Sequence, residues 1–236
     1  MKKILITGAS SGIGKELCLY FLKNGYKVVG LSRSKVKIND ESFNHYCIDL
    51  SENFQKLSEI ITESVNNEKY DFMIHCAGME QTLPIKLQNP EAIQKIFSLN
   101  VFSSIELVRL FSSKRISNNN SSILLFSSIM GLLGQKGKVG YCSTKAAVLG
   151  LVKASALELA PRKIKVNAIL PGVVRTEMTT KLFNLLGEKE MDSIIKMHPL
   201  GIGNIDDLIP LINTLTINNS WITGQNFIID GGYSIQ

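Results

Sequence analysis

Short apolar runs alternate with helical patterns along most of this chain, and this alternation restricts its fold more than any other feature. The apolar runs predict strands at 4–7, 27–31, 45–48, 72–75, 123–127, 166–170 and 227–229. The segments between them predict helices near 13–24, 52–66, 91–115, 142–160 and 206–217. Several strands are apolar at consecutive positions, as expected for parallel strands that helices cover on both faces. The pattern therefore predicts one α/β domain over residues 1–236, built on a doubly wound, seven-stranded parallel sheet.

Two segments interrupt this alternation. Residues 118–122 read Asn-Asn-Asn-Ser-Ser and predict a polar turn before the fifth strand. Residues 173–205 form one long stretch without a clear strand after the sixth. Ligands bind outside the carboxyl ends of such strands, so we expect 173–205 to be a substrate lid. Apolar residues of this segment either favour a partly hydrophobic ligand or pack the lid's own helix, namely Met178, Leu182, Phe183 and Leu186.

Composition narrows the classes of partner. The formal net charge is +6, but the lysines and arginines are scattered, and no basic run indicates a nucleic-acid site. The four cysteines have no metal-ligand spacing, so we expect reduced thiols and no metal. No apolar run reaches the length of about 18 residues that a membrane-spanning helix needs, and the N-terminus lacks the pattern of a signal peptide. We therefore expect a cytoplasmic protein without a membrane partner.

A glycine-rich turn directly follows the first predicted strand. Gly8, Gly12 and Gly14 have the spacing G-x-x-x-G-x-G, and a predicted helix begins there. Glycines let a backbone approach a pyrophosphate closely, and a helix N-terminus offers free N–H groups to it. The residues between the glycines would share this contact, namely Ser10, Ser11 and Ile13. A purely structural strand-to-helix turn is the alternative.

The end of the second strand bears on which dinucleotide binds. NAD sites usually have a carboxylate there for the ribose 2′-hydroxyl, whereas this chain has Ser32 and Arg33. Both could receive a 2′-phosphate, so we expect NADP(H) to be preferred and NAD(H) to be possible. An ordinary surface arginine is the alternative. Asp49 and Leu50 follow the third strand, where they could meet the adenine ring, although Asp49 or Ser51 could equally cap the next helix.

A tyrosine and a lysine four residues apart indicate proton chemistry. Tyr141 and Lys145 share one face of a predicted helix. A nearby ammonium lowers the pKa of a phenol and lets it act as a general acid, while the lysine could also bond the nicotinamide ribose. Ser127 and Ser128 end the fifth strand, where a hydroxyl could polarise a substrate oxygen or satisfy local backbone groups. Asn100 stands mid-helix, either as an exposed residue or beside Lys145.

Taken in order, these motifs resemble the short-chain dehydrogenase/reductase family over nearly the whole chain. The resemblance rests on the glycine turn and on Tyr141 and Lys145 with their partners, and it implies a Rossmann fold. It implies a catalytic set of Asn100, Ser128, Tyr141 and Lys145. It also implies cofactor contacts at Ala77, Gly78, Pro171, Gly172, Val174 and Thr176. Within the family the chain is most similar to 3-oxoacyl-acyl-carrier-protein reductases and related carbonyl reductases. One departure is His75, where the family usually has Asn, and we expect a structural histidine there.

The family mechanism implies that NADPH delivers a hydride to a carbonyl carbon while Tyr141 protonates the oxygen. Ser128 would hold that oxygen, Lys145 would tune Tyr141 and bind the ribose, and Asn100 would anchor a water relay. The substrate would be a small or acyl-carrier-bound carbonyl compound, and a sugar or polyol dehydrogenase is the alternative enzyme. A non-catalytic NADP-binding regulator or scaffold is the alternative of another class. The resemblance further implies a dimer or tetramer assembled through the helices near 91–115 and 142–160.

Overall fold

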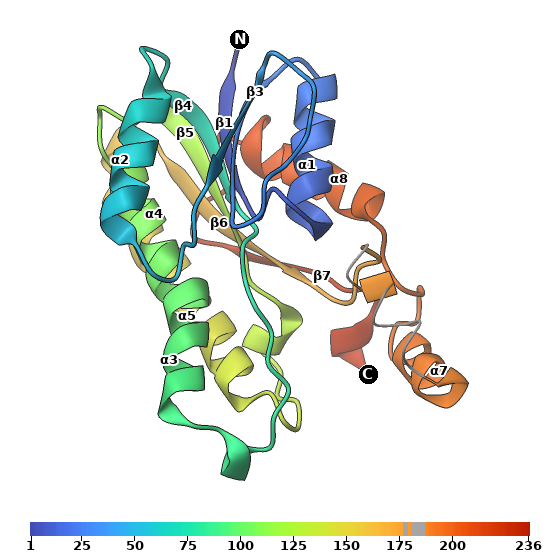
Figure 1. The fold of residues 1–236 in the computed structure, drawn as a ribbon. Helices are drawn as coiled ribbons and strands as arrows, with labels where there is room; N and C mark the ends of the chain where they lie inside the picture. The colour runs from blue at the N-terminus through green and yellow to red at the C-terminus, as the bar shows by residue number, and fades with distance from the viewer. Residues whose placement is uncertain (177–178, 181–186) are drawn as a thin grey trace.

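The computed structural model describes residues 1–176, 179–180 and 187–236, apart from the side chains of 188–190. Its centre is a seven-stranded sheet with the order β3-β2-β1-β4-β5-β6-β7, and every neighbouring pair is parallel (Figure 1). The strands are β1 (Lys3–Thr7), β2 (Lys27–Ser32), β3 (Phe43–Cys47), β4 (Tyr70–His75), β5 (Ser117–Phe126), β6 (Lys165–Pro171) and β7 (Asn226–Ile229). The predicted doubly wound parallel sheet is confirmed.

Helices cover both faces of this sheet. They are α1 (Gly12–Lys23), α2 (Phe54–Val65), α3 (Pro90–Phe97), α4 (Ser103–Phe111), α5 (Val139–Leu159), α7 (Glu188–Lys196) and α8 (Ile205–Thr216). Figure 1 shows α1 and α8 on one face and α2, α4 and α5 on the other. Successive strand residues serve the two faces in turn: Ile4 and Ile6 pack in the core beneath α1 and α8, while Leu5 belongs to the opposite core. This is why the strands are apolar at consecutive positions.

The predicted helix 91–115 is divided into α3, a π-helical turn η2 (Ser98–Phe102) and α4. Asn100 lies in η2 and is buried, so its interpretation as an exposed helical residue was wrong. π-helical turns insert an extra residue into a helix and often mark functional sites. The helix predicted at 142–160 begins earlier, at Val139, so Tyr141 lies within its first turn.

The polar turn predicted at 118–122 was also wrong, because these residues belong to β5. Tyr70 of β4 pairs with Ser117 and Phe72 pairs with Ser122, so β5 bulges between these two points. Asn120 has a φ of 61°, a left-handed conformation that asparagine tolerates better than most residues. The bulge is held by Lys165, whose Nζ donates to both the backbone oxygen and Oδ1 of Asn120 at 2.8 Å.

After β6 the chain makes one isolated parallel bridge between Val174 and Gly203 and contains helix α7. The four apolar residues on which the hydrophobic-lid hypothesis rested lie outside the described residues, namely Met178, Leu182, Phe183 and Leu186. No helix in the described part of the chain combines the length and apolar character needed to cross a bilayer.

Candidate active site

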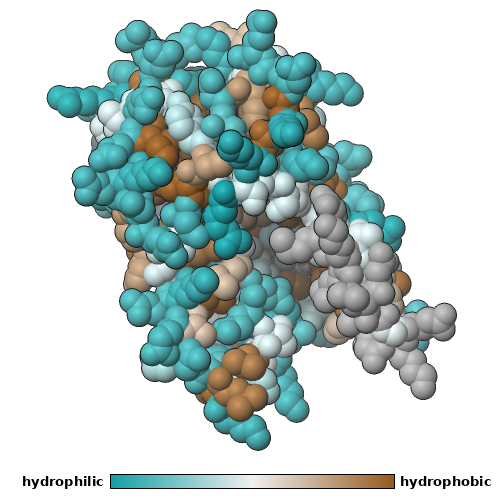
Figure 2. Space-filling model, in the orientation of Figure 1, coloured by the Kyte–Doolittle hydropathy of each residue, from teal (hydrophilic) through white to brown (hydrophobic). Residues whose placement is uncertain are grey.

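A cavity of about 440 Å³ opens at the carboxyl ends of β1, β4, β5 and β6. Figure 2 shows a hollow near the middle of a face that hydrophilic residues otherwise dominate. Of the predicted cofactor-binding residues, the following line the cavity: Gly8, Ser11, Gly12, Ile13, Gly14, Ala77, Gly78, Tyr141, Lys145, Pro171, Gly172, Val174 and Thr176. The sheet thus gathers at one edge residues that lie far apart in the sequence.

The glycine turn joins β1 to α1 through two close backbone approaches. Gly8 has a φ of 73°, and a Cβ there would lie 3.1 Å from the backbone nitrogen of Ala77. A Cβ on Gly14 would lie only 2.5 Å from the backbone oxygen of Gly8, a distance that real Cβ atoms do not reach. Ser11 is the N-cap of α1, and its side chain makes no cap hydrogen bond. The first N–H groups of α1 are therefore available to an anion at the cavity wall.

His75, at the end of β4, connects this turn to helix α4 through hydrogen bonds from its two ring nitrogens. Its Nδ1 lies 2.7 Å from Thr7 Oγ1, and its Nε2 lies 3.3 Å from Ser103 Oγ. The Ser103 hydroxyl donates to the Leu99 carbonyl, so it accepts from Nε2–H of the ring. Thr7 accepts from the Ala77 N–H and therefore donates to Nδ1. Burial, together with nearby Lys145, lowers the pKa of His75 to about 3, so the ring is neutral and structural.

The residues predicted to contact the adenosine end lie at the ends of β2 and β3. Ser32 is buried and bonds Ser34 O at 2.9 Å and His45 Nε2 at 2.8 Å, whereas Arg33 is exposed. Asp49 accepts from the backbone N–H and the hydroxyl of Ser51, at 2.9 and 2.6 Å. These two residues do not cap α2; its N-cap is Asn53, whose side chain accepts from Lys56 N. Five predicted cofactor residues do not line the cavity, namely Ser10, Ser32, Arg33, Asp49 and Leu50.

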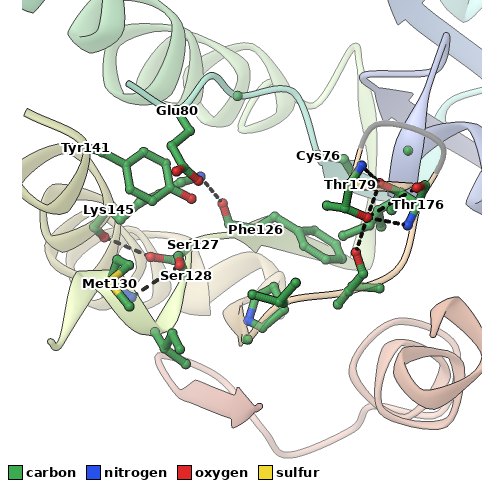
Figure 3. A pocket seen from close by; sticks show the side chains of 18 of the residues that line it. Cys76, Glu80, Phe126, Ser127, Ser128, Met130, Tyr141, Lys145, Thr176 and Thr179 are labelled. Carbon is green, nitrogen blue, oxygen red and sulfur yellow. Dashed lines mark hydrogen bonds between the residues drawn. The ribbon is translucent and has the colours of Figure 1, made fainter. Parts of the chain in front are cut away.

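Tyr141, Lys145 and Ser128 meet inside the cavity (Figure 3). The ammonium nitrogen of Lys145 lies 5.7 Å from the centroid of the Tyr141 ring and donates to the Phe126 carbonyl at 2.9 Å. Ser128 Oγ accepts from the backbone N–H of Met130 at 3.2 Å, and its side chain is near enough to Tyr141 to lower the pKa of the phenol. The Ser127 hydroxyl instead donates to the Lys145 carbonyl at 2.9 Å. Ser128, and not Ser127, is therefore the serine that faces the phenol.

Burial has the largest effect on the pKa values of Tyr141 and Lys145. Burial raises the pKa of Tyr141 to about 12, with Ser128 opposing the rise and Glu80 and Cys142 adding to it. Burial also lowers the pKa of Lys145 to about 8, against the opposing effects of Cys76 and Glu80. The sequence led us to expect a phenol made more acidic by Lys145. The shift has the opposite direction, because the loss of hydration on burial outweighs the lowering effect of Ser128.

Asn100 joins the segment after β4 to α5. Its Nδ2 donates to Met79 O at 2.9 Å and to Thr144 Oγ1 at 3.0 Å, while its Oδ1 accepts from Met79 N at 2.9 Å. A Cβ on Gly78 would lie 3.4 Å from Lys145 Nζ, so the glycine leaves room for the ammonium. The amide of Asn100 thus holds the segment that Lys145 packs against.

Sequence reasoning missed several residues that line the same cavity, namely Glu80, Gln135, Lys138, His198 and Tyr233. Glu80 and Lys138 form an ion pair of 2.5 Å, although they are far apart in the chain. His198 accepts from Val173 N at 3.1 Å through Nε2, and its Nδ1 lies 2.8 Å from Ile194 O. No local motif marks these residues, because each reaches the cavity only through the tertiary fold.

Comparison with known proteins agrees with this geometry. The family described as short chain dehydrogenase matches residues 2–185. The 3-oxoacyl-[acyl-carrier-protein] reductase FabG of Rickettsia prowazekii is 34% identical, and the match covers 98% of this chain and 96% of that protein. A solved structure described as ElxO with NADP bound is 31% identical with a TM-score of 0.88, covering 100% of this chain and 99% of that chain. A 4-hydroxyisoleucine dehydrogenase complexed with NADH is 27% identical with a TM-score of 0.83, and both chains are covered completely.

Proposed function

Because this chain belongs to the short-chain dehydrogenase family of NAD(P)-dependent oxidoreductases, we propose that it uses NADPH to reduce a 3-oxoacyl thioester or a related small carbonyl compound. The observation that carries the proposal is the meeting of Ser128, Tyr141 and Lys145 in one cavity with the glycine turn. The similarity to a 3-oxoacyl-[acyl-carrier-protein] reductase over 98% of this chain supports the substrate class. We take residues 1–236 as one cofactor-binding domain, with 173–205 as its substrate lid.

The described residues of the cavity fit a dinucleotide. A Cβ on Gly12 would lie 3.9 Å from the Thr176 side chain, so it would project into the space between turn and lid that a pyrophosphate needs. The N-terminus of α1 offers backbone N–H groups and a positive dipole end at the same place. Pro171 and Gly172 line the cavity on its β6 side, where we place the nicotinamide.

When bound, NADPH supplies the hydride that reaches the carbonyl carbon. Tyr141 donates its phenolic proton to the developing alkoxide, and its high pKa keeps that proton in place at neutral pH. Ser128 already accepts from Met130 N–H, so its own proton is free to hold the same substrate oxygen. Lys145 uses one proton on the Phe126 carbonyl and keeps two for the nicotinamide ribose and for returning a proton to Tyr141. Asn100 anchors the relay by holding Met79 and Thr144 around the lysine.

We propose NADPH as the preferred coenzyme because the end of β2 offers Ser32 and Arg33 and no carboxylate. Arg33 is exposed, and its positive charge reaches the neighbouring Asp49, whose pKa is low because its hydrogen bonds to Ser51 and this charge outweigh burial. A 2′-phosphate would gain charge-assisted hydrogen bonds from the same guanidinium. NADH would lack that phosphate and gain nothing from Arg33.

We also propose a homo-oligomer, a dimer or a tetramer. Helices α4 and α5 each expose a large apolar side chain to solvent: Ile105 is 46% exposed and Leu157 is 80% exposed. Phe102, just before α4, is 47% exposed as well. Contiguous exposed apolar patches often mark interfaces, and we expect these three side chains to contribute to one. Sedimentation velocity tests the proposal, and a monomer at micromolar concentration would contradict it.

A steady-state screen tests the proposed function. NADPH oxidation is followed with 3-oxoacyl thioesters, simple ketones and sugars, with and without an acyl carrier protein. We expect the highest kcat/KM for a 3-oxoacyl thioester. Preferential oxidation of a sugar or polyol with NADP⁺ would instead identify the alternative dehydrogenase. Tight NADPH binding without turnover of any compound would overturn the enzymatic proposal and favour a regulator.

A further inference from the structure

An ion pair that the mechanism above does not use stands beside the proton donor. Glu80 lies in the segment after β4, and Lys138 immediately precedes α5. Their charged atoms are 2.5 Å apart, and both residues line the cavity next to Tyr141 (Figure 3 shows Glu80 and Tyr141). The side chain of Lys138 is only 16% exposed, and Glu80 is its ion-pair partner. Half-buried charges at a reaction centre act on it far more strongly than surface charges.

The two charges have opposite effects on the ionisation of the Tyr141 phenol. The ammonium of Lys138 lies 6.0 Å from the centroid of the Tyr141 ring, nearly as close as that of Lys145 at 5.7 Å. Glu80 has the opposite effect to the two ammonium groups, because its negative charge disfavours the phenolate and raises the pKa of Tyr141. Two ammonium groups therefore lie near the Tyr141 ring, and one carboxylate opposes their effect on the phenol.

Other titratable groups of the described structure lie in or near the same cavity. Cys76, Lys145, His198 and Tyr233 line it, and Cys142 of α5 adds to the rise in the pKa of Tyr141. Among those named, Glu80 is the carboxylate that raises the pKa of the phenol. Changing one member of the Glu80–Lys138 pair changes the net charge at the phenol and keeps the side chains of Ser128 and Lys145, although loss of Glu80 also removes its raising effect on the pKa of Lys145.

We propose that the Glu80–Lys138 ion pair sets the pH range in which Tyr141 exchanges its proton, with Glu80 and Lys138 acting in opposite directions. This inference rests on the proposed proton-donor role of Tyr141. Glu80 and Lys138 are both positioning residues, since they act on the substrate only through the phenol of Tyr141. The pair also connects two cavity walls, and a purely structural role as a clasp is the competing explanation.

The fold lets the two explanations be separated. The backbone holds the same walls together without the ion pair, because Leu83 N donates to Gly137 O at 2.7 Å. Glu80→Gln and Lys138→Gln both break the same ion pair, so a clasp predicts equal effects in the two variants. A charge effect predicts opposite ones: Glu80→Gln leaves Lys138 to stabilise the phenolate, and Lys138→Gln leaves Glu80 to destabilise it.

The experiment measures alcohol oxidation with NADP⁺ as a function of pH in the full-length protein. Oxidation needs the phenolate, so below the pKa of Tyr141 the rate at fixed pH follows the phenolate fraction. We expect a shift of about half to one pH unit for each variant, since Glu80 is half exposed and solvent screens it. At fixed pH this is roughly a 3- to 10-fold faster rate for Glu80→Gln and a similarly slower rate for Lys138→Gln. The double variant returns toward wild type.

Glu68→Gln is the matched control, since it breaks a Lys27–Glu68 ion pair of 2.6 Å at the opposite edge of the sheet. Equal losses in both single variants, or no shift in either, would overturn the proposal. The ionisation of the phenol is also titrated directly by difference absorbance against Tyr141→Phe. If no alcohol is oxidised by the wild type, the proposed function fails, while opposite shifts in this titration still support the inference.

Discussion

Acid should destabilise this protein through one buried histidine. The pKa of His75 falls from 6.5 to about 3, chiefly because the ring is buried and also because Lys145 is near. The unfolded chain binds a proton on this residue below pH 6.5, whereas the folded chain does not bind it until about pH 3. The stability that His75 contributes is therefore complete above pH 6.5 and is lost as the pH falls through this window.

The size of the effect follows from the shift. Each pH unit inside the window removes about 1.4 kcal/mol from the free energy of unfolding. Between pH 6.5 and pH 5 the loss is about 2 kcal/mol, and near pH 3 it approaches about 5 kcal/mol. The structural cause is specific. A protonated ring would carry a second N–H toward Thr7 Oγ1, so the Thr7 hydroxyl would lose the acceptor of its own proton and the ring would carry a buried charge.

Urea unfolding at pH 8 and pH 5 measures this loss in the wild type and in His75→Asn. Circular dichroism is the appropriate signal, because Trp221 is 93% exposed and would report little of the core. We expect the variant to lose about 2 kcal/mol less than the wild type between the two pH values. His45→Asn is the comparison variant: burial also lowers the pKa of this half-buried histidine, so we expect its substitution to remove a smaller part of the pH dependence. Equal pH dependence in the wild type and in His75→Asn would refute the reasoning.

Three further predictions concern the turn, the acid and the coenzyme. Gly14→Ala places a Cβ 2.5 Å from Gly8 O, so we expect the free energy of unfolding to fall by about 1–3 kcal/mol and calorimetry to show weaker NADPH binding. Gly134→Ala is the control, because its Cβ meets nothing within 4 Å and should leave both quantities nearly unchanged. Tyr141→Phe should lower kcat by about 10²- to 10⁴-fold with an unchanged NADPH Kd; retained turnover would contradict its role. Arg33→Ala should raise the KM for NADPH by about 10- to 100-fold and leave that for NADH unchanged, and equal effects on both coenzymes would refute the phosphate contact.

The sequence alone determined the layers of the fold and the local part of the site. Alternation of apolar runs with helical patterns requires helices on both faces of a parallel sheet, and the sheet has that form. Tyr141 and Lys145 could be paired because four residues make about one helical turn, whatever the rest of the chain does. Part of the glycine turn was readable for the same reason, since Gly14 approaches the nearby backbone of Gly8, whereas the approach of Gly8 to Ala77 depends on the tertiary fold.

Only the tertiary structure decided the environment of these groups. Glu80 meets Lys138, and His75 meets Thr7, across sequence separations that no local pattern spans. Burial also reversed the expected direction of the Tyr141 pKa, because hydration depends on every segment packed around the phenol and not on its neighbour one turn away. Local spacing thus fixes which residues can share a face, whereas charge, solvent exposure and long-range partners are set by the packing of distant segments at the carboxyl edge of the sheet.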